Sequence, residues 1–163
     1  MADLLLNAPM QSELLRTNRF LLTFPSDLGI AAWYVSTAQR PKINISKQAI
    51  PFLNTETYVA GRYVWQPLQI TFRDPIGPSA SQALMEWVRL HAESVTGRMG
   101  YFAGYARDIE IAMLDPTGVA ISKWILKNCM LTDNIDFGAL NYASDALADI
   151  TITVQPQYCI LAY

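Results

Sequence analysis

Histidine, cysteine and paired carboxylates carry much of protein catalysis and metal binding, and this chain of 163 residues holds few of them. His91 is its only histidine. The apolar residues around it recur at helical spacing, which places His91 on the apolar face of a predicted helix. A packed histidine is favoured over a catalytic one, because no nucleophile or orienting group accompanies it in the sequence.

Two pairs of acids have a spacing that could form paired carboxylates, Asp108 with Glu110 and Asp133 with Asp136. Such pairs act as acid and base in glycoside hydrolysis. Asp108 and Glu110 alternate along a predicted strand and share one of its faces. That arrangement favours a solvated polar face over a catalytic pair.

The two cysteines, Cys129 and Cys159, lie in apolar, strand-like stretches without a CxxC or Cys/His grouping. We interpret both as reduced packing residues. The sequence therefore predicts no catalytic, cofactor-binding or metal-binding residue, no cofactor, and a protein that is not an enzyme.

Residues 97–105 (GRMGYFAGY) form a glycine-rich and aromatic segment that includes Arg98. Contact with a phosphate or a base is one interpretation. The glycine spacing fits neither GxGxxG nor a P-loop, so a flexible connection between a helix and a strand is favoured.

The composition describes the surroundings of these residues. The net charge is −2, which excludes the basic field of proteins that grip phosphate backbones. Apolar residues make up 52% of the chain and charged residues 16%, below the usual value of about 25%. So few charges leave apolar patches exposed on a monomer, which favours an obligate oligomer.

The chain length suits one domain, 1–163. A short apolar run at residues 4–6 without preceding basic residues is not a signal peptide, and no stretch has the length of a membrane span, so we expect folding in a cytoplasm and no membrane anchor.

Alternation of apolar and polar residues predicts strands through most of the chain. The predicted strands cover residues 18–24, 33–39, 41–50, 68–74, 105–114, 119–127 and 149–160, with 128–132 as an optional further short strand. The first two are expected to form a β-hairpin, and the turn at 115–118 a second one. Residues 51–61 are expected to be a long loop. One helix is predicted from Ser79 or Ser81 to about Val95, closed by Gly97.

About seven strands with one helix predict a mainly β fold, a β-sandwich or barrel with the helix against one sheet or edge. Residues 1–17 are expected to form an N-terminal arm.

Residues 61–74 (GRYVWQPLQITFRD) resemble the corresponding stretch of tail tube proteins of contractile-tailed bacteriophages, in which a glycine-arginine turn leads into a strand that ends in an aspartate. Similar features continue in the family's order along the chain. They are residues 18–20, Trp87 in the helix, 105–109, 114–118, Trp124, 128–129 and 144–154.

The resemblance implies a structural subunit of a virion tail, assembled in the bacterial host cytoplasm. In that family six subunits join their sheets edge to edge into one ring-wide inner β-barrel, and stacked rings form a tube that conducts DNA during ejection. Its implied partners are further copies of itself, the tail sheath protein, and baseplate and tail terminator proteins. Tubes of type VI secretion, other contractile injection systems and tube-initiating baseplate proteins share the fold and remain alternatives.

An inner barrel needs a polar face toward the lumen. The predicted lumen-lining residues are Asp149, Thr151, Thr153, Gln155, Gln157, Gln69 and Thr71. A neutral to weakly acidic lumen gives phosphate no counter-charge, so DNA is expected to pass without specific binding.

The segment 46–61 resembles the extended loop by which family members reach a neighbouring subunit or ring. The predicted contact residues are Phe52, Leu53, Tyr58 and Arg62. A loop folded over its own core is the alternative.

Two other classes stay open. A small β-barrel that binds an apolar ligand also fits the aromatic content and the single helix, and it predicts a monomer with a pocket. An enzyme is the third.

Overall fold

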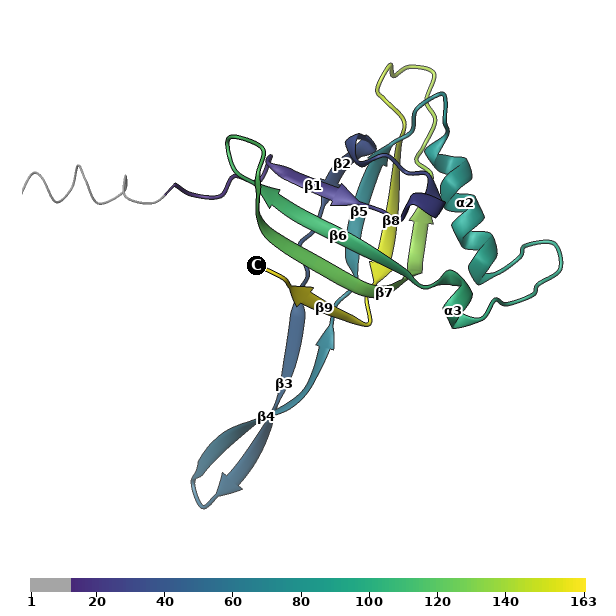
Figure 1. Cartoon of the computed structure of the whole chain (residues 1–163). Coiled ribbons are helices and arrows are strands. Elements are labelled where there is room, and N and C mark those ends of the chain that lie inside the picture. The colour runs from purple at the N-terminus through teal and green to yellow at the C-terminus, as the bar shows by residue number, and fades with distance from the viewer. Residues whose placement is uncertain (1–12) are drawn as a thin grey trace, which may run out of the picture.

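The computed structural model describes residues 13–163, which fold into nine strands and one long helix (Figure 1). The strands are β1 (Phe20–Thr23), β2 (Val35–Ala38), β3 (Ile43–Phe52), β4 (Thr55–Trp65), β5 (Leu68–Arg73), β6 (Arg107–Leu114), β7 (Ala120–Asp136), β8 (Asp149–Gln155) and β9 (Tyr158–Leu161). The helices are α2 (Ala80–His91) and the short α3 (Phe102–Tyr105), with 3₁₀ turns η2 (Ser26–Leu28) and η3 (Ala32–Tyr34). The mainly β prediction is confirmed.

Six strands form one continuous antiparallel path in the order β1-β6-β7-β8-β5-β2, and β9 pairs with β7 as the seventh strand of the sheet. The path folds around the core because β7 changes partner along its length: its first part pairs with β6 and β9, and its last part with β8. The strands do not close into a barrel within the monomer. β1 and β2 end the path, and each pairs on one side only.

The bend in β7 occurs where Asn128 adopts a left-handed conformation with φ of 52°. Asn128 donates its backbone N–H to Asp108 Oδ1 at 2.9 Å, and Lys127 donates to Asp108 Oδ2 at 2.7 Å. Partial burial opposes ionisation of this carboxyl, but the bonds from Lys127 and Asn128 outweigh it and lower the pKa of Asp108.

The core lies between the two halves of the folded path and under α2. Leu68, Ile70 and Phe72 of β5 are at most 1% exposed, as their alternation predicts. From the other strands and α2 come Leu22, Leu84, Trp87, Ile109, Ile111, Leu126, Ile150, Ile152 and Val154, all at most 2% exposed.

The aspartate that ends the 61–74 motif caps the helix. Asp74 Oδ1 accepts the backbone N–H of Ala80 at 3.1 Å and that of Ser81 at 3.4 Å, and the Ser81 hydroxyl donates to Asp74 Oδ2. Ser79 is the N-cap residue, and its Oγ accepts the N–H of Gln82 at 3.4 Å. Side-chain acceptors at this position satisfy helix N–H groups that have no partner within the helix.

The prediction of a long loop at 51–61 is wrong. Residues Ile43–Phe52 and Thr55–Trp65 pair as a two-stranded hairpin that projects from the body (Figure 1). Nine cross-strand pairs join β3 to the returning strand β4. Pro51 does not interrupt the pairing, because a two-stranded ribbon leaves an outer edge free on each strand.

The predicted hairpin of the first two strands is also wrong. β1 pairs with β6 and β2 with β5, at opposite ends of the path. The intervening residues cross from one half of the sandwich to the other, and they bury Leu28 and Ile30 in the core on the way. The predicted hairpin of β6 and β7 is confirmed, and Asp115 Oδ1 accepts the N–H groups of Thr117 and Val119 in its turn.

Three boundaries differ from the prediction. The helix ends at His91 rather than Val95, because Ala92 is extended and bridges to Met99; Val95 is 92% exposed. Residues 128–132 continue β7 instead of forming a separate strand. The predicted strand 149–160 is two strands separated at Pro156, and the second pairs with a different part of β7.

Candidate assembly surfaces

A polar, concave surface covers the outer face of β5, β8 and the end of β7. Cross-strand pairing places Gln69 opposite Thr153 and Thr71 opposite Thr151, with the two threonine hydroxyls 3.3 Å apart. Asp149 lies opposite Arg73 at the end of the same face. Five of the seven predicted lumen residues therefore share one sheet face.

Gln155 and Gln157 have different surroundings. Gln155 donates its side-chain amide to the carbonyl oxygens of Trp65 at 2.8 Å and Pro156 at 2.9 Å, which ties the end of β8 to the base of the β3–β4 hairpin. Gln157 follows the end of β8 and donates its backbone N–H to Lys127, on the half of the sandwich formed by β6, β7 and β9.

The structure adds four polar residues to this surface that the lumen prediction missed. They are Gln39 from the end of β2, and Asp133, Asn134 and Asp136 from the end of β7. The sequence carried a signal for the two acids, which are spaced as a candidate pair. No lysine or arginine lines the hollow among the described residues, so its charge is acidic.

The β3–β4 hairpin carries the four predicted contact residues, and all four are exposed. Phe52 is 69% and Leu53 89% exposed at the tip. The alternative, a loop folded over its own core, does not hold: every residue of β3 is exposed, as are nine of the eleven in β4.

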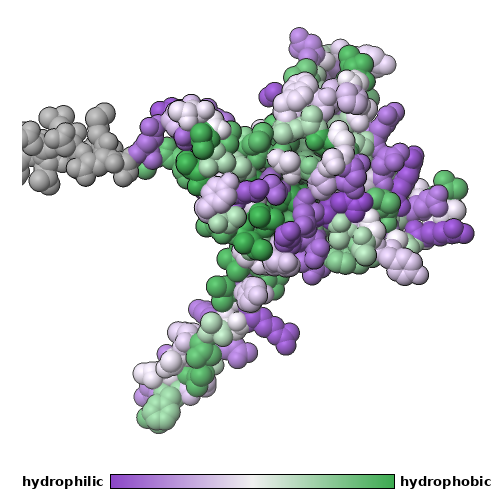
Figure 2. Space-filling view, viewed as in Figure 1, coloured by the Kyte–Doolittle hydropathy of each residue, from purple (hydrophilic) through white to green (hydrophobic). Residues whose placement is uncertain are grey.

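The outer half of the hairpin has one uncharged face and one face that carries Lys47 and Glu56. Pairs Gln48–Val59, Ile50–Thr57 and Phe52–Thr55 share a face on which Ile50 and Phe52 are each at least half exposed. On the opposite face the Tyr58 hydroxyl donates to Glu56 Oε2 at 3.0 Å, and Lys47 Nζ lies 4.7 Å from the centre of the Tyr58 ring. Figure 2 shows hydrophobic and hydrophilic residues together along this arm.

A bulge lies midway along the hairpin, where the pairing shifts between Ile45 and Lys47. Ser46 Oγ donates to the Arg62 carbonyl oxygen at 3.0 Å, and Gly61 lies against Ser46 so closely that a Cβ at position 61 would overlap the Ser46 hydroxyl. Glycine is therefore required there for the two strands to approach.

His91 is a packed residue, as predicted. Its Nδ1 lies 2.9 Å from the Trp87 carbonyl oxygen, so Nδ1 donates and the neutral ring accepts the Leu131 N–H at Nε2, at 3.1 Å. The ring stacks on Tyr105 at a centroid distance of 4.2 Å. Burial lowers the pKa of His91, opposed by the bond to Trp87, and the Arg107 charge lowers it further.

The remaining chemically capable groups have structural surroundings. Lys127 pairs with Asp108 and Lys123 with Glu110, each at 2.7 Å, across β6 and β7. Both cysteines are free thiols. Burial raises the pKa of Cys129 to about 12 and the pKa of Cys159 to about 11, so both stay protonated at neutral pH and are poor nucleophiles and metal ligands.

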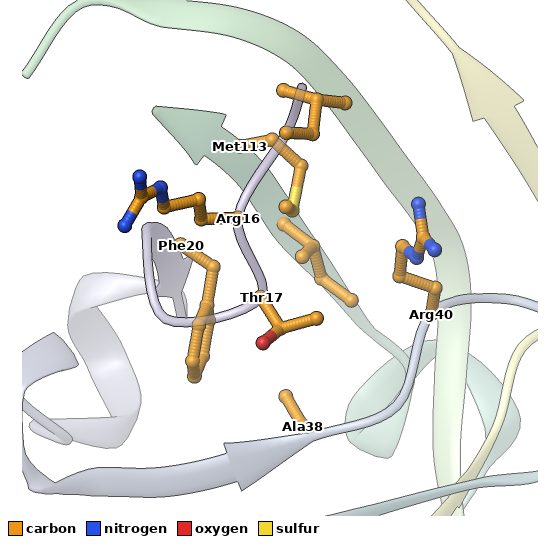
Figure 3. A pocket seen from close by; sticks show the side chains of 8 residues that line it. Arg16, Thr17, Phe20, Ala38, Arg40 and Met113 are labelled. Carbon is orange, nitrogen blue, oxygen red and sulfur yellow. The ribbon is translucent and has the colours of Figure 1, made fainter. Parts of the chain in front are cut away.

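A small cavity lies between the free strands β1 and β2 (Figure 3). Phe20, Ala38, Ile111 and Met113 line its apolar part, with Arg16 and Arg40 on either side. Its volume is about 150 Å³. Pockets for small ligands usually span roughly 300 to 1,000 Å³, so this cavity gives little support to a ligand-binding module.

Within residues 13–163, no group of three or more histidine, cysteine or acidic side chains is arranged to hold a metal ion. The same part of the chain contains no helix of the length and apolarity needed to cross a membrane.

Solved structures share this fold across nearly the whole chain. A chain in the sheath/tube terminator of the extracellular contractile injection system PVC, in its extended state, superposes with a TM-score of 0.73 at 12% identity, covering 94% of this chain and 99% of that one. A chain of the anti-feeding prophage tube terminating cap gives 0.68 at 18% identity, covering 92% and 91%. The Hcp1 protein of E. coli EAEC 042 gives 0.50 at 13% identity, covering 89% and 91%.

No family model and no curated protein sequence matches this chain. At these identities the similarity establishes the fold, which is that of tube components of contractile injection systems, as the resemblance in sequence predicted. None of the three structures is of an enzyme.

Proposed function

We propose that this chain is the structural subunit of a contractile phage tail tube, in which six copies form a ring and stacked rings enclose a channel for DNA. The single observation that carries the proposal is the combination, on a tube-type fold, of a polar concave sheet face with a projecting hairpin arm that is exposed at nearly every residue. A monomer gains nothing from either surface, whereas an assembly uses both.

Ring closure would use the ends of the strand path. β1 and β2 each present backbone N–H and C=O groups without a sheet partner on one side. Pairing these edges with neighbouring copies satisfies the backbone groups and joins the concave faces into one inner barrel. In that barrel Gln69, Thr71, Thr151 and Thr153 would line the lumen, with Asp149 at its rim.

The chemistry of that lumen suits passage rather than binding. The wall consists of amide and hydroxyl groups with a few carboxylates, and its Arg73 lies opposite Asp149 at the rim, so DNA would release few condensed counterions by touching it. The tube would therefore conduct DNA during ejection without holding it.

The hairpin would make the contact between neighbouring subunits or rings, through Phe52, Leu53, Tyr58 and Arg62. Exposed aromatic and aliphatic side chains on a projecting ribbon are typical of binding anchors, since burial in a partner removes them from water. The sheath, baseplate and terminator proteins of the tail would bind surfaces of the finished tube.

A role as the terminator of such a tube is the second candidate function. It is supported by two structures with this fold, which come from a tube terminator and a tube terminating cap. In that case the chain would end a tube instead of forming its length. Tubes of type VI secretion and of other injection systems stay alternatives of the same class, and a neighbouring sheath gene with phage head genes would favour the phage tail.

The test is assembly of the purified chain, followed by sedimentation and negative-stain microscopy. We expect rings or hollow tubes, and we expect deletion of residues 51–57 to give folded subunits that do not polymerise, because the deleted tip packs against nothing in the body. Deletion of residues 141–143 shortens another exposed turn. Its circular dichroism spectrum is the control for the effect of loop shortening on folding, and it is not used as a control for assembly. Normal tubes from the 51–57 deletion, or a wild-type chain that stays monomeric at high concentration, contradict the proposal.

A further inference from the structure

Two segments of this chain carry opposite charges and lie at opposite ends of the body. Residues 40–65, the β3–β4 hairpin with its approach, contain four basic residues and one acidic residue, a net charge of +3. Residues 133–149, which join the end of β7 to the start of β8, contain four aspartates and no basic residue, a net charge of −4. We name the second stretch the acidic segment.

These charges form no salt bridge within the described monomer. The salt bridges of residues 13–163 number five, and all lie outside both segments. The hairpin's basic side chains are exposed, and so are the four aspartates of the acidic segment. Charged side chains elsewhere on the body commonly form salt bridges. The basic residues of the hairpin and the aspartates of the acidic segment do not, and the two sets have opposite charge.

Both segments also expose apolar side chains. Besides Phe52 and Leu53 at the hairpin tip, the acidic segment holds Leu140, Tyr142 and Leu147, which are 93%, 112% and 73% exposed. Interfaces commonly combine such an apolar centre with a charged rim. Attraction between the rims would set orientation and association rate, and the apolar contacts would hold the complex.

The positions of the two segments determine whether the hairpin contacts its own chain or another copy. In Figure 1 the hairpin leaves the body at the bottom, while the acidic segment forms the loop at the top. A hairpin therefore cannot reach the acidic segment of its own chain. A head-to-tail contact between two copies uses different surfaces on each. Because the two segments lie at opposite ends of the body, repetition of this contact along the line between them builds a stack.

We infer that the β3–β4 hairpin of one copy docks on the acidic segment of the next copy, with Lys47 and Arg62 facing Asp145 and Asp149. The occupant of the acidic segment is thus a second copy of this chain. The inference rests on the proposed function and deepens it, because it assigns the receiving surface and its chemistry.

Complementary charge reversal tests the contact. One variant carries Lys47→Glu with Arg62→Glu, and the other Asp145→Lys with Asp149→Lys. Each alone is expected to raise the protein concentration needed for tube formation at least tenfold, and an equimolar mixture is expected to form tubes again, since each variant can then meet only the other. Arg89→Glu with Arg98→Glu, exposed residues of the body, serves as the matched control and should assemble like wild type.

Cysteine cross-linking gives a readout that does not depend on charge. Copies with Leu53→Cys, mixed with copies with Tyr142→Cys, should form a disulfide-linked pair under mild oxidation. Copies with Thr17→Cys, beside the cavity between β1 and β2, should not be linked to Leu53→Cys. Linking to Thr17→Cys instead shows that the hairpin docks in that cavity.

The outcomes separate the two proposals. Wild-type tubes with no rescue in the mixture and no Leu53–Tyr142 link overturn the docking inference and leave the tube function standing. A wild-type chain that forms neither rings nor tubes overturns both.

Discussion

Single residues in this protein fix the bends that let strands change partner. Asn128 has a φ of 52° at the point where β7 leaves β6 and turns toward β8, and its N–H is held by Asp108. Alternation correctly placed strands on both sides of this residue. It could not show that they were one strand, because a left-handed residue within a strand leaves no periodic signal.

Asn128→Val should destabilise the fold by about 1–2 kcal/mol, because a β-branched side chain is strained at positive φ. Asn128→Gly should keep stability within about 0.5 kcal/mol, since glycine adopts this conformation freely. Urea unfolding below the assembly concentration measures both. Equal stability for the valine and glycine variants contradicts this account of the bend.

His91 makes stability depend on pH. The folded chain needs the neutral ring, because a proton on Nε2 would point at the Leu131 N–H. The pKa of His91 in the folded chain is accordingly below the ordinary value of about 6.5. The unfolded chain therefore binds a proton first as the pH falls. This contribution to stability is complete above about pH 6.5 and decreases below it, by at most about 1.4 kcal/mol per pH unit, until the folded ring also protonates.

His91→Gln should remove that dependence between pH 7.5 and 5.5 while lowering stability at pH 7.5. Urea unfolding of both chains at several pH values provides the comparison. A wild-type slope that the glutamine variant retains in full shows that another group is responsible.

At the scale of elements, sequence alternation identified β5, β6 and most of β8 because each buries one face in the core. It failed for the pairing of β1 and β2, which depends on partners about 90 and 35 residues away. It also failed for β4, which buries no face and therefore shows no regular apolar–polar alternation. The hairpin arm was thus located by the family resemblance, while its strand pairing required the structure.

Gly61→Ala tests how the bulge shapes this arm. The added Cβ would meet Ser46 and push the two strands apart, so the arm should change its twist and assembly should weaken several-fold. Stability of the body should change by less than about 0.5 kcal/mol, because the arm packs on nothing there. Gly104→Ala, where a Cβ meets open space, is the control. Assembly of Gly61→Ala equal to that of the control contradicts the role of the bulge.

At the scale of the whole molecule, the sequence predicted a polar sheet face. Five of the seven residues assigned to that face lie together on it. The sequence prediction missed Asp133 and Asp136 on that face. The bend in β7 brings these residues there, and alternation does not show the bend. Gln157 left the set because it follows the end of β8, and Gln155 left it because its side-chain amide binds the carbonyl oxygens of Trp65 and Pro156. The lumen assignment itself stays a prediction.

Gln69→Lys with Thr151→Lys adds two cations per subunit to the proposed lumen wall. DNA ejection from assembled tails should become slower and regain speed as salt rises, because phosphate contacts release counterions. The same two-lysine change at Gln82 and Ser94, uncharged and exposed residues on and after α2, should have no such effect. Ejection at the wild-type rate at all salt concentrations contradicts the lumen assignment.

A three-dimensional reconstruction of the assembled wild-type chain by electron cryomicroscopy tests the central claim most directly. The account predicts a hollow ring or tube in which β5, β8 and the end of β7 present Gln69, Thr71, Thr151 and Thr153 to the channel, with β1 and β2 joined to neighbouring copies. A particle in which this face points outward, or one with no central channel, would contradict it.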